Sequence, residues 1–384
     1  MCYCRDTKLK SKNGKSRNHW SAPDVCAPTC WKNNSFDKNA MKDLKQLIRP
    51  NIQALPLFAE TVKALSAPAV QVKLDANESS HNAPHNRYPD AAQTELRNAV
   101  AKITGLRPEC VCMTAGTEEA VDLVYRVFCT PGKDNVVSIS PTRSLYKARA
   151  DINDVEFRSI TLEEKFNLKA EKLLSACNQH TKAILLCSPN NPTGNLLEEK
   201  EIVCLLENFD GMVVIDESFA DFSDSSSVRA LLPRHHNLIV LNSFSHAQAC
   251  AGSRVGFLLA IPPVTEYFHR TRIPHNLSRE AQAQALDIIG RRYDVDKWIK
   301  HLREEKRRVM AAFLQLACCK EVFPSESNFF LARFNDAPAV LRYLKSKGIA
   351  VADCSTLPLC ENCLRITIGL PNENSQLLGA LRQF

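Results

Sequence analysis

Residues suited to binding a phosphate group follow one strongly apolar segment of the chain. Residues 238–241 (LIVL) are typical of a buried strand, and Ser243 and Ser245 add hydroxyl groups directly after it. His246 comes next, and Arg254 follows eight residues later. Hydroxyl and guanidinium groups donate hydrogen bonds to phosphate oxygens, and an imidazole with a reference pKa of about 6.5 can accept a proton near neutral pH. The segment therefore predicts an anion site with a candidate base beside it.

Other polar segments would meet this one at the same edge of a sheet. Asp216 ends the apolar run MVVID, 30 residues before His246, and a parallel sheet would bring both residues to its carboxyl edge. Asn191 lies in the polar turn SPNNPTG, between a predicted strand and a predicted helix. Residues 116–118 (GTE) precede an apolar-periodic segment. One interpretation makes Thr117 the helix N-cap, and the backbone amides of such a helix start could also bind an anion.

The elements that must position these residues alternate between helix and strand. The strands are continuously apolar, which indicates a mostly parallel sheet covered on both faces. We expect helices at 92–104, 171–177 and 198–209, and strands at 136–140, 182–188, 212–216 and 238–244. The predicted fold class is therefore α/β, with a large doubly wound, mostly parallel sheet that binds ligands at the carboxyl ends of its strands.

A smaller unit is predicted after the large sheet. A long helix with a charged face is expected over 294–317, followed by a strand (328–334), a helix ending in a glycine cap (337–348), a strand (363–369) and a helix (374–384). This order predicts a small α+β C-terminal domain. We expect four regions: an extension (1–40), an N-terminal arm (41–75), the large ligand-binding domain (76–275), and connecting helices with the small domain (276–384).

In their order and spacing, these segments resemble the histidinol-phosphate aminotransferase family, which has the fold of type I pyridoxal-phosphate (PLP) aminotransferases. The resemblance covers residues 41–384 and includes SPNNPTG, the Asp216-Glu217 pair and SFSHAQACAGSRVG. It implies PLP as the cofactor, with Asp216 bound to the ring nitrogen and Asn191 bound to the 3′-oxygen of the ring. The other implied cofactor contacts are Gly116, Thr117, Glu118, Arg143, Phe219, Ser243, Ser245 and Arg254.

The same resemblance implies substrate-binding residues and a partner. Asn77 in LDANES, Tyr88 in NRYPD, Asn328 in SNFFL and Arg365 in CLRITIG match family segments. The family tyrosine at the position of Tyr88 reaches the active site of the neighbouring subunit, which implies a homodimer. Arg365 is implied to bind the carboxylate or phosphate side of an amino or keto substrate. Simpler readings are a surface charge for Arg365 and a helix cap for Asp216.

The departures from the family pattern fall on the chemistry. His246 stands where the family has the lysine that bonds covalently to PLP, and an imidazole cannot form that bond, so any PLP would be held noncovalently. Arg143 replaces an aromatic ring in the P-T-Y/F-x-x-Y segment. It should oppose a protonated PLP ring, because two cations about 4 Å apart repel by about 4 kcal/mol at an effective dielectric constant near 20. Phe219 replaces a tyrosine, and Ala352 and Cys354 replace the two arginines that grip the substrate phosphate.

These changes leave several functions open. In the first, the protein resembles a histidinol-phosphate aminotransferase that has lost ordinary amino transfer between L-histidinol phosphate and 2-oxoglutarate, yet keeps a PLP or pyridoxamine-phosphate site. In the second, an altered enzyme uses His246 as a general base on a noncovalently held cofactor. In the third, the chain is a non-catalytic binding or scaffold protein, in which His246 is a polar loop residue and the extension binds a partner.

Composition excludes several other classes. The chain has 49 Lys and Arg against 42 Asp and Glu, a formal net charge of +7. Residues 1–40 hold eight basic and three acidic residues, or +5, so the remainder carries only +2 and does not favour a nucleic-acid partner. Apolar runs are far shorter than the roughly 20 residues of a membrane span, and there is no secretory signal, so we expect a cytoplasmic protein.

The cysteines indicate a reducing compartment. The 16 cysteines are scattered through a long chain, and Cys187 and Cys204 lie within apolar runs, where we expect small core residues. The extension (1–40) is polar, and we expect it to be disordered. A zinc site could be formed there by Cys2, Cys4, Cys26, Cys30 and His19, but the spacing matches no established pattern, and no metal is assigned.

Overall fold

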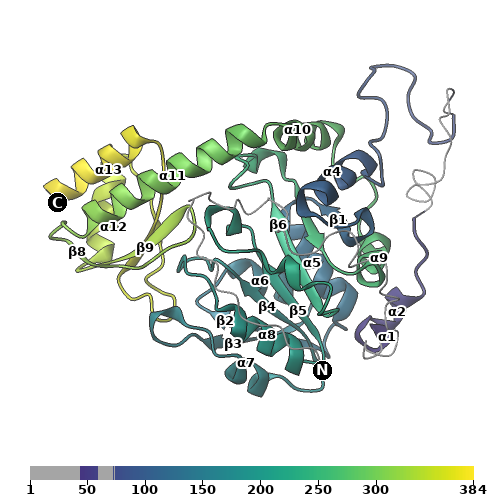
Figure 1. Cartoon of the computed structure of the whole chain (residues 1–384), viewed down its shortest axis with the longest axis horizontal. Coiled ribbons are helices and arrows are strands. Elements are labelled where there is room, and N and C mark those ends of the chain that lie inside the picture. Colours follow the sequence, from purple (N-terminus) through teal and green to yellow (C-terminus); the bar gives the residue numbers. More distant parts are fainter. Residues whose placement is uncertain (1–43, 59–71, 73) are drawn as a thin grey trace, which may run out of the picture.

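The computed structural model describes residues 44–58, 72 and 74–384 (Figure 1). The predictions made for residues 1–40, namely disorder and the alternative zinc site, lie outside these residues. The first described helices are α1 (Leu44–Leu47) and α2 (Pro50–Gln53).

A seven-stranded mixed sheet forms the larger part of the fold, which confirms the predicted α/β class. Strand β7 is antiparallel to both of its neighbours, and all the other pairs are parallel. The central strands β5 and β6 are buried throughout and are aliphatic up to their polar carboxyl ends, as expected for a sheet covered on both faces. In spatial order the strands are β1 (Val111–Thr114), β7 (Gly256–Leu259), β6 (Leu238–Ser243), β5 (Met212–Asp216), β4 (Thr181–Cys187), β2 (Asn135–Ser140) and β3 (Glu156–Thr161).

Helices cover this sheet. Helix α5 begins directly after β1 and packs against β6, β7 and α6, whereas α7 packs against β2, β3 and α8. The helices are α4 (Thr94–Thr104), α5 (Gly116–Phe128), α6 (Ser144–Ile152), α7 (Ala170–Ala176), α8 (Glu199–Asn208), α9 (Pro262–Thr271) and α10 (Arg279–Gly290). Short 3-10 turns are η2 (Pro108–Cys110), η3 (Glu164–Phe166), η4 (Ala220–Phe222), η5 (Val228–Leu231) and η6 (Ala251–Ser253).

A four-stranded antiparallel sheet forms the smaller unit at one end of the molecule (Figure 1). The long helix α11 leads from α10 to this unit, and α12 and α13 pack together on it. Helix α11 ends four residues earlier than the predicted 317, because the chain must turn before β8 begins at Cys319. The elements are α11 (Arg292–Phe313), β8 (Cys319–Val322), β9 (Phe329–Phe334), α12 (Ala337–Ser346), β10 (Ala352–Asp353), β11 (Cys363–Thr367) and α13 (Pro371–Gln383).

The buried apolar residues form two clusters. The first surrounds the seven-stranded sheet and extends to Phe329 and Leu331 of β9, so it joins the two sheets. The second holds α11, α12 and α13 on the four-stranded sheet. Cys187 is fully buried, as predicted, whereas Cys204 is only half-buried. Among the described residues, no helix is both long enough and apolar enough to cross a membrane.

The register of the parallel strands fixes the edge where the predicted site residues lie. Asp216, the last residue of β5, pairs with Leu241 of β6 on one side and with Cys187 of β4 on the other. Ser243 ends β6, and His246 follows it in the loop toward β7. The sheet therefore brings Asp216 and the segment after β6 to its carboxyl edge, as the sequence predicts.

Candidate active site

Asp216 lies at the centre of the site and is only 1% exposed. Its Oδ1 accepts hydrogen bonds from the backbone amide of Ser218 (3.0 Å) and from Ser218 Oγ (2.5 Å). Its Oδ2 accepts from Tyr146 Oη (3.1 Å) and from Arg143 Nη1. Two of these donors follow β5 in sequence, and the other two come from the beginning of α6. Asp216 is thus held by four donors from its own chain.

Arg143 forms a buried ion pair with Asp216. Its side chain is 12% exposed, and the same Nη1 lies 3.3 Å from Thr117 Oγ1 and 3.4 Å from Ser218 Oγ. Burial alone would lower the pKa of Arg143, but the charge of Asp216 raises it above its usual value. Arg143 also lies 3.8 Å from Glu118. The sequence predicted that Arg143 would oppose a cationic ring. The structure shows that Arg143 also binds Asp216, the carboxylate that the resemblance assigns to the ring nitrogen.

His246 lies in a row of stacked side chains. Its ring stacks on the buried ring of Phe219, with centroids 4.4 Å apart and planes 30° apart. Phe219 meets the ring of Phe329 edge-on at 5.2 Å, and the guanidinium of Arg365 lies over Phe329 at 5.3 Å. The row therefore runs from the loop after β6 to β9 and β11 of the four-stranded sheet.

The environment keeps the imidazole of His246 neutral. Burial, and next to it the positive charge of Arg143, lower the pKa of His246 to about 4, although Asp216 and Glu118 act in the opposite direction. At neutral pH the ring can accept a proton. As a base it is much weaker than an unperturbed histidine, because its pKa lies far below neutrality.

The predicted phosphate-binding residues gather at the start of α5 and the end of β6. Ser243 is buried, and its Oγ accepts a hydrogen bond from the backbone amide of Ser245 (3.3 Å). Arg254, 48% exposed, donates from Nη2 to Glu118 Oε2 (2.5 Å). Gly116 has φ of +79°, and a Cβ atom there would lie 2.6 Å from Arg254 Nη2, so a larger residue would be strained and would displace the end of the Arg254 side chain.

The predicted N-cap role of Thr117 is wrong. Helix α5 begins at Gly116, and its N-cap is Ala115. The backbone amide of Ala115 donates to Glu119 Oε2 (2.5 Å), so a carboxylate satisfies an amide at this helix start. Thr117 lies inside the first turn, where its hydroxyl accepts the hydrogen bond from Arg143 instead.

Asn191 and Arg365 connect the two sheets. Arg365 Nη1 donates to Asn191 Oδ1 (2.5 Å), and Arg365 Nε is buried with no hydrogen-bond partner among the described residues. Asn328 lies at the start of the same region, where its carbonyl oxygen accepts from the amide of Ile368 (2.9 Å). On β10, Ala352 pairs with Arg365, and Cys354 is buried just beyond it. The predicted arginine-to-alanine and arginine-to-cysteine changes therefore lie beside Arg365.

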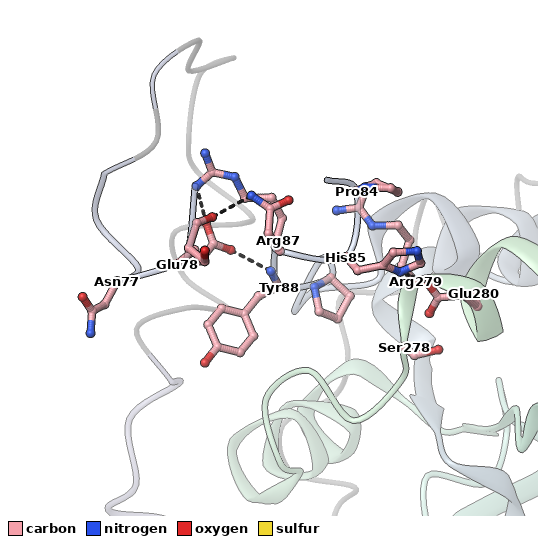
Figure 2. Close-up of a pocket in the computed structure, with 12 residues that line it drawn as sticks. Asn77, Glu78, Pro84, His85, Arg87, Tyr88, Ser278, Arg279 and Glu280 are labelled. Carbon is pink, nitrogen blue, oxygen red and sulfur yellow. Dashed lines mark hydrogen bonds and ion pairs between the residues drawn. The ribbon is translucent and has the colours of Figure 1, made fainter. Parts of the chain in front are cut away.

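Asn77 and Tyr88 lie away from this group. They belong to a segment that projects from the body of the molecule (Figure 1), and Tyr88 is 61% exposed, with its ring stacked on His275. Figure 2 shows Asn77 pointing outward, while Glu78 accepts hydrogen bonds from Arg87 and the amide of Tyr88. The segment and the start of α10 line a cavity of about 450 Å³. Within the described chain, nothing brings Asn77 or Tyr88 into contact with Asp216 or His246.

Two residues of the site were not predicted. Tyr146 donates to Asp216, and burial, followed by the charge of Asp216, raises its pKa well above the usual value. The sequence signal for it existed, because Tyr146 is the last residue of the P-T-x-x-x-Y segment that starts at Pro141. Ser218 carries no such signal, since a serine two residues after a strand is common in turns.

No group of three or more His, Cys, Asp or Glu residues within 44–58, 72 and 74–384 is arranged to hold a metal ion. The described cysteines are free thiols: Cys110, Cys112, Cys129, Cys177, Cys187, Cys204, Cys250, Cys318, Cys319, Cys354, Cys360 and Cys363.

The fold and the residues gathered at this sheet edge define a class of protein. The family model for aminotransferases of class I and II matches residues 61–381. The chain is 42% identical over 344 residues to the histidinol-phosphate aminotransferase of Bacteroides fragilis, covering 90% of this chain and 100% of that protein. It is 36% identical over 346 residues to that of Christiangramia forsetii, covering 89% and 99%. The chain therefore belongs to the histidinol-phosphate aminotransferase family.

Solved structures share the fold. The histidinol-phosphate aminotransferase from Clostridium acetobutylicum has a TM-score of 0.72 and 19% identity, covering 78% of this chain and 90% of that chain. The enzyme from Sinorhizobium meliloti, solved in complex with pyridoxal-5′-phosphate, has a TM-score of 0.71 and 20% identity, covering 87% and 96%. At these identities the likeness supports the fold alone.

Proposed function

We propose that this chain has lost the ordinary amino transfer of its family and that its site holds a phosphate-bearing ligand noncovalently, with PLP or pyridoxamine phosphate as the family's candidates. The observation that carries this proposal is the stacking of His246 on Phe219 at the position that the resemblance assigns to the lysine. In the part of the chain that the structure describes, no lysine interacts with Asp216, Asn191 or His246. Among the described residues, the site therefore lacks an amine that could bond to an aldehyde.

A buried lysine elsewhere does not replace it. Burial lowers the pKa of Lys306 to about 8, which would suit a reactive amine. However, its Nζ donates to the carbonyl oxygens of Ser325 (2.6 Å) and Ser327 (2.7 Å). Lys306 thus ties α11 to the loop before β9, and we assign it a structural role.

The residues present fit the two ends of PLP unequally. Ser243, Ser245, Arg254 and the start of α5 supply the donors that a phosphate requires. The ring end does not fit, because the four donors on Asp216 leave no acceptor for a protonated ring nitrogen. When bound, PLP supplies a ring that withdraws electrons from a substrate, and that ability depends on the protonated nitrogen.

The substrate side supports the loss of the family reaction. Ala352 and Cys354 stand where the resemblance places two phosphate-binding arginines, and the contact of each such arginine with a phosphate contributes about 1.5 to 3 kcal/mol. Arg365 remains, with its Nε unpartnered among the described residues, so one anionic group could still be bound there. Histidinol phosphate would be held weakly.

A second candidate function uses His246 as a general base on a noncovalent cofactor. It is favoured by the neutral imidazole at the lysine position, and it is weakened by the pKa of about 4. A cofactor-dependent reaction that disappears in His246→Ala and changes in kind in His246→Lys would support this candidate. A purely non-catalytic binding role predicts indifference to both variants.

We also propose a homodimer in a reducing, cytoplasmic environment. A second copy of the chain would cover the exposed ring of Tyr88 and the projecting segment around it. In a reducing compartment the cysteines of the chain would remain free thiols. Light scattering of the purified protein would give the mass of a dimer; the mass of a monomer at micromolar concentration would contradict the dimer.

Two measurements test the main proposal. The purified protein is assayed with histidinol phosphate and 2-oxoglutarate beside an active family member, and we expect no turnover above background. It is then mixed with PLP, and absorbance spectra are recorded before and after borohydride, with peptide mapping of any fixed adduct. We expect no adduct at the site. Turnover comparable to that of the active relative, or a borohydride-fixed lysine at the site, would overturn the proposal.

A further inference from the structure

The hydrogen-bonding capacity of Asp216 is fully used. A carboxylate offers about four lone-pair positions, and Asp216 fills them with two donors from Ser218, one from Tyr146 and one from Arg143. An additional donor, such as the N–H of a protonated ring, would have to displace one of these groups.

Arg143 is the donor that decides whether such a displacement occurs. The hydroxyl of Tyr146 is neutral, but Arg143 carries the charge that compensates Asp216, and both side chains are nearly withdrawn from solvent. Separating them would leave two buried charges unpaired, which is far more costly than the loss of a neutral hydrogen bond. Thr117 and Ser218 hold the same nitrogen of Arg143 from two other sides. These contacts hold the guanidinium of Arg143 in its position beside Asp216.

The phosphate-binding residues do not depend on this ion pair. Ser243 and Ser245 come from the loop after β6, and Arg254 is bound to Glu118 rather than to Asp216. Glu118 Oε2 accepts a hydrogen bond from Arg254 Nη2 at 2.5 Å. A phosphate could replace Glu118 as the partner of Arg254 while Arg143 stays bound to Asp216. One half of the site can thus bind an anion while the other half remains closed to a cationic ring.

We propose that Arg143 determines ligand specificity: the site accepts phosphate monoesters whose body is uncharged, and it discriminates against any ligand that presents a cationic nitrogen to Asp216, including PLP with a protonated ring. This inference rests on the proposed function, in which the site holds a phosphate ester noncovalently. It adds the class of ligand and the residue that selects it. Replacing Arg143 by a neutral aromatic side chain would free one acceptor of Asp216 and restore selectivity for PLP.

The test compares two phosphate esters of similar size, PLP and benzyl phosphate, whose ring has no nitrogen. Dissociation constants are measured by calorimetry for the wild type, Arg143→Phe and Arg143→Gln. The wild type is expected to bind benzyl phosphate more tightly than PLP. Each variant is expected to bind PLP about tenfold more tightly than the wild type does, with little change for benzyl phosphate. Arg143→Gln keeps a polar side chain that is shorter and uncharged, in case Arg143→Phe does not fold.

The outcomes separate this inference from the function on which it rests. Tighter binding of PLP than of benzyl phosphate by the wild type would overturn the inference even if neither variant folds, and it would leave the proposed phosphate site intact. No binding of either ester would overturn both the inference and the proposed phosphate site. Unchanged PLP affinity in a folded variant would do the same. None of these results would restore amino transfer, whose loss is tested separately by turnover and by the borohydride adduct.

Discussion

Arg143 and Asp216 lie 73 residues apart in the sequence, and their side chains meet in a buried ion pair. Removing one partner leaves the other charge uncompensated, so we expect Asp216→Asn to lower the free energy of unfolding by about 3 to 5 kcal/mol. The matched control is Asp151→Asn, which breaks the exposed pair with Lys147 and should cost less than about 1 kcal/mol. Urea unfolding followed by circular dichroism measures both values.

The double variant Arg143→Met/Asp216→Asn tests whether the pair is the cause. With both charges removed, no buried charge is left unpaired, and we expect the double variant to be more stable than the sum of the two single changes predicts. Additivity of the two changes to within about 0.5 kcal/mol would contradict a coupled pair.

The surroundings of His246 should lower its pKa in the folded protein. We expect nuclear magnetic resonance titration to give a value of about 4 in the wild type. In Arg143→Met the pKa should rise, because the neighbouring positive charge is gone, but it should stay below the reference value of about 6.5, because burial, the larger cause, remains. Comparison with His246→Asn assigns the resonance. A wild-type value near 6.5 would show that the ring is not shielded by burial and by Arg143.

The same pKa predicts how stability depends on pH. In the folded chain His246 is neutral above about pH 4, whereas in the unfolded chain it takes up a proton below about pH 6.5. The unfolded state therefore binds more protons in this window, and stability falls as pH drops from 6.5 to 4, by at most about 3 kcal/mol from this group. We expect a shallower loss in His246→Asn. His269, whose pKa burial lowers to about 3, remains in both proteins, so the difference between them isolates His246.

Gly116 leaves room for the guanidinium of Arg254 at the start of α5. Its φ of +79° and the nearness of Arg254 Nη2 mean that Gly116→Ala would push this guanidinium away from the start of α5. We expect affinity for inorganic phosphate to fall about five- to tenfold. Gly379→Ala in α13, where no atom lies within 4 Å of an added Cβ, is the control and should bind normally. Unchanged phosphate affinity in folded Gly116→Ala would remove Arg254 from the anion site.

The substitution His246→Lys would place an amine in the site. An amine at this position should bond to PLP, so borohydride should fix an adduct there, whereas the exposed control His180→Lys should give none at the site. Turnover of histidinol phosphate should still be absent, because Arg143 continues to occupy Asp216 and because Ala352 and Cys354 give the substrate phosphate no arginine. Recovery of activity by this change alone would mean that the lysine was the single missing element.

The sequence predicted the sheet edge well because long apolar strands dominate its pattern. The run 212–216 became β5 without change, and the parallel register follows from its neighbours. Strands β1, β3 and β7 of this sheet were not predicted. The four residues of β1 and of β7 are too few for a periodic signal, and β3 (EFRSIT) has no continuous apolar run.

Side-chain partners within the site were harder to predict. The charge of Arg143 was visible in the sequence, but its reach to Asp216 depends on where α6 begins relative to β5. The hydroxyl of Thr117 looked like a helix cap and instead accepts from Arg143, because the fold supplied a stronger donor. At Thr117, a hydrogen bond from Arg143, 26 residues away in the sequence, therefore replaces the local capping hydrogen bond.

The stacked row from His246 through Phe219 to Phe329 also bears on how this chain could change in future generations. His246 and Phe219 both depart from the family pattern and pack on each other, and such aromatic pairs contribute about 0.5 to 1.5 kcal/mol beyond the area they bury. Replacing His246 by the family lysine would lose this contact. The two rings thus stabilise each other, so a substitution that removes either ring alone carries a cost in stability.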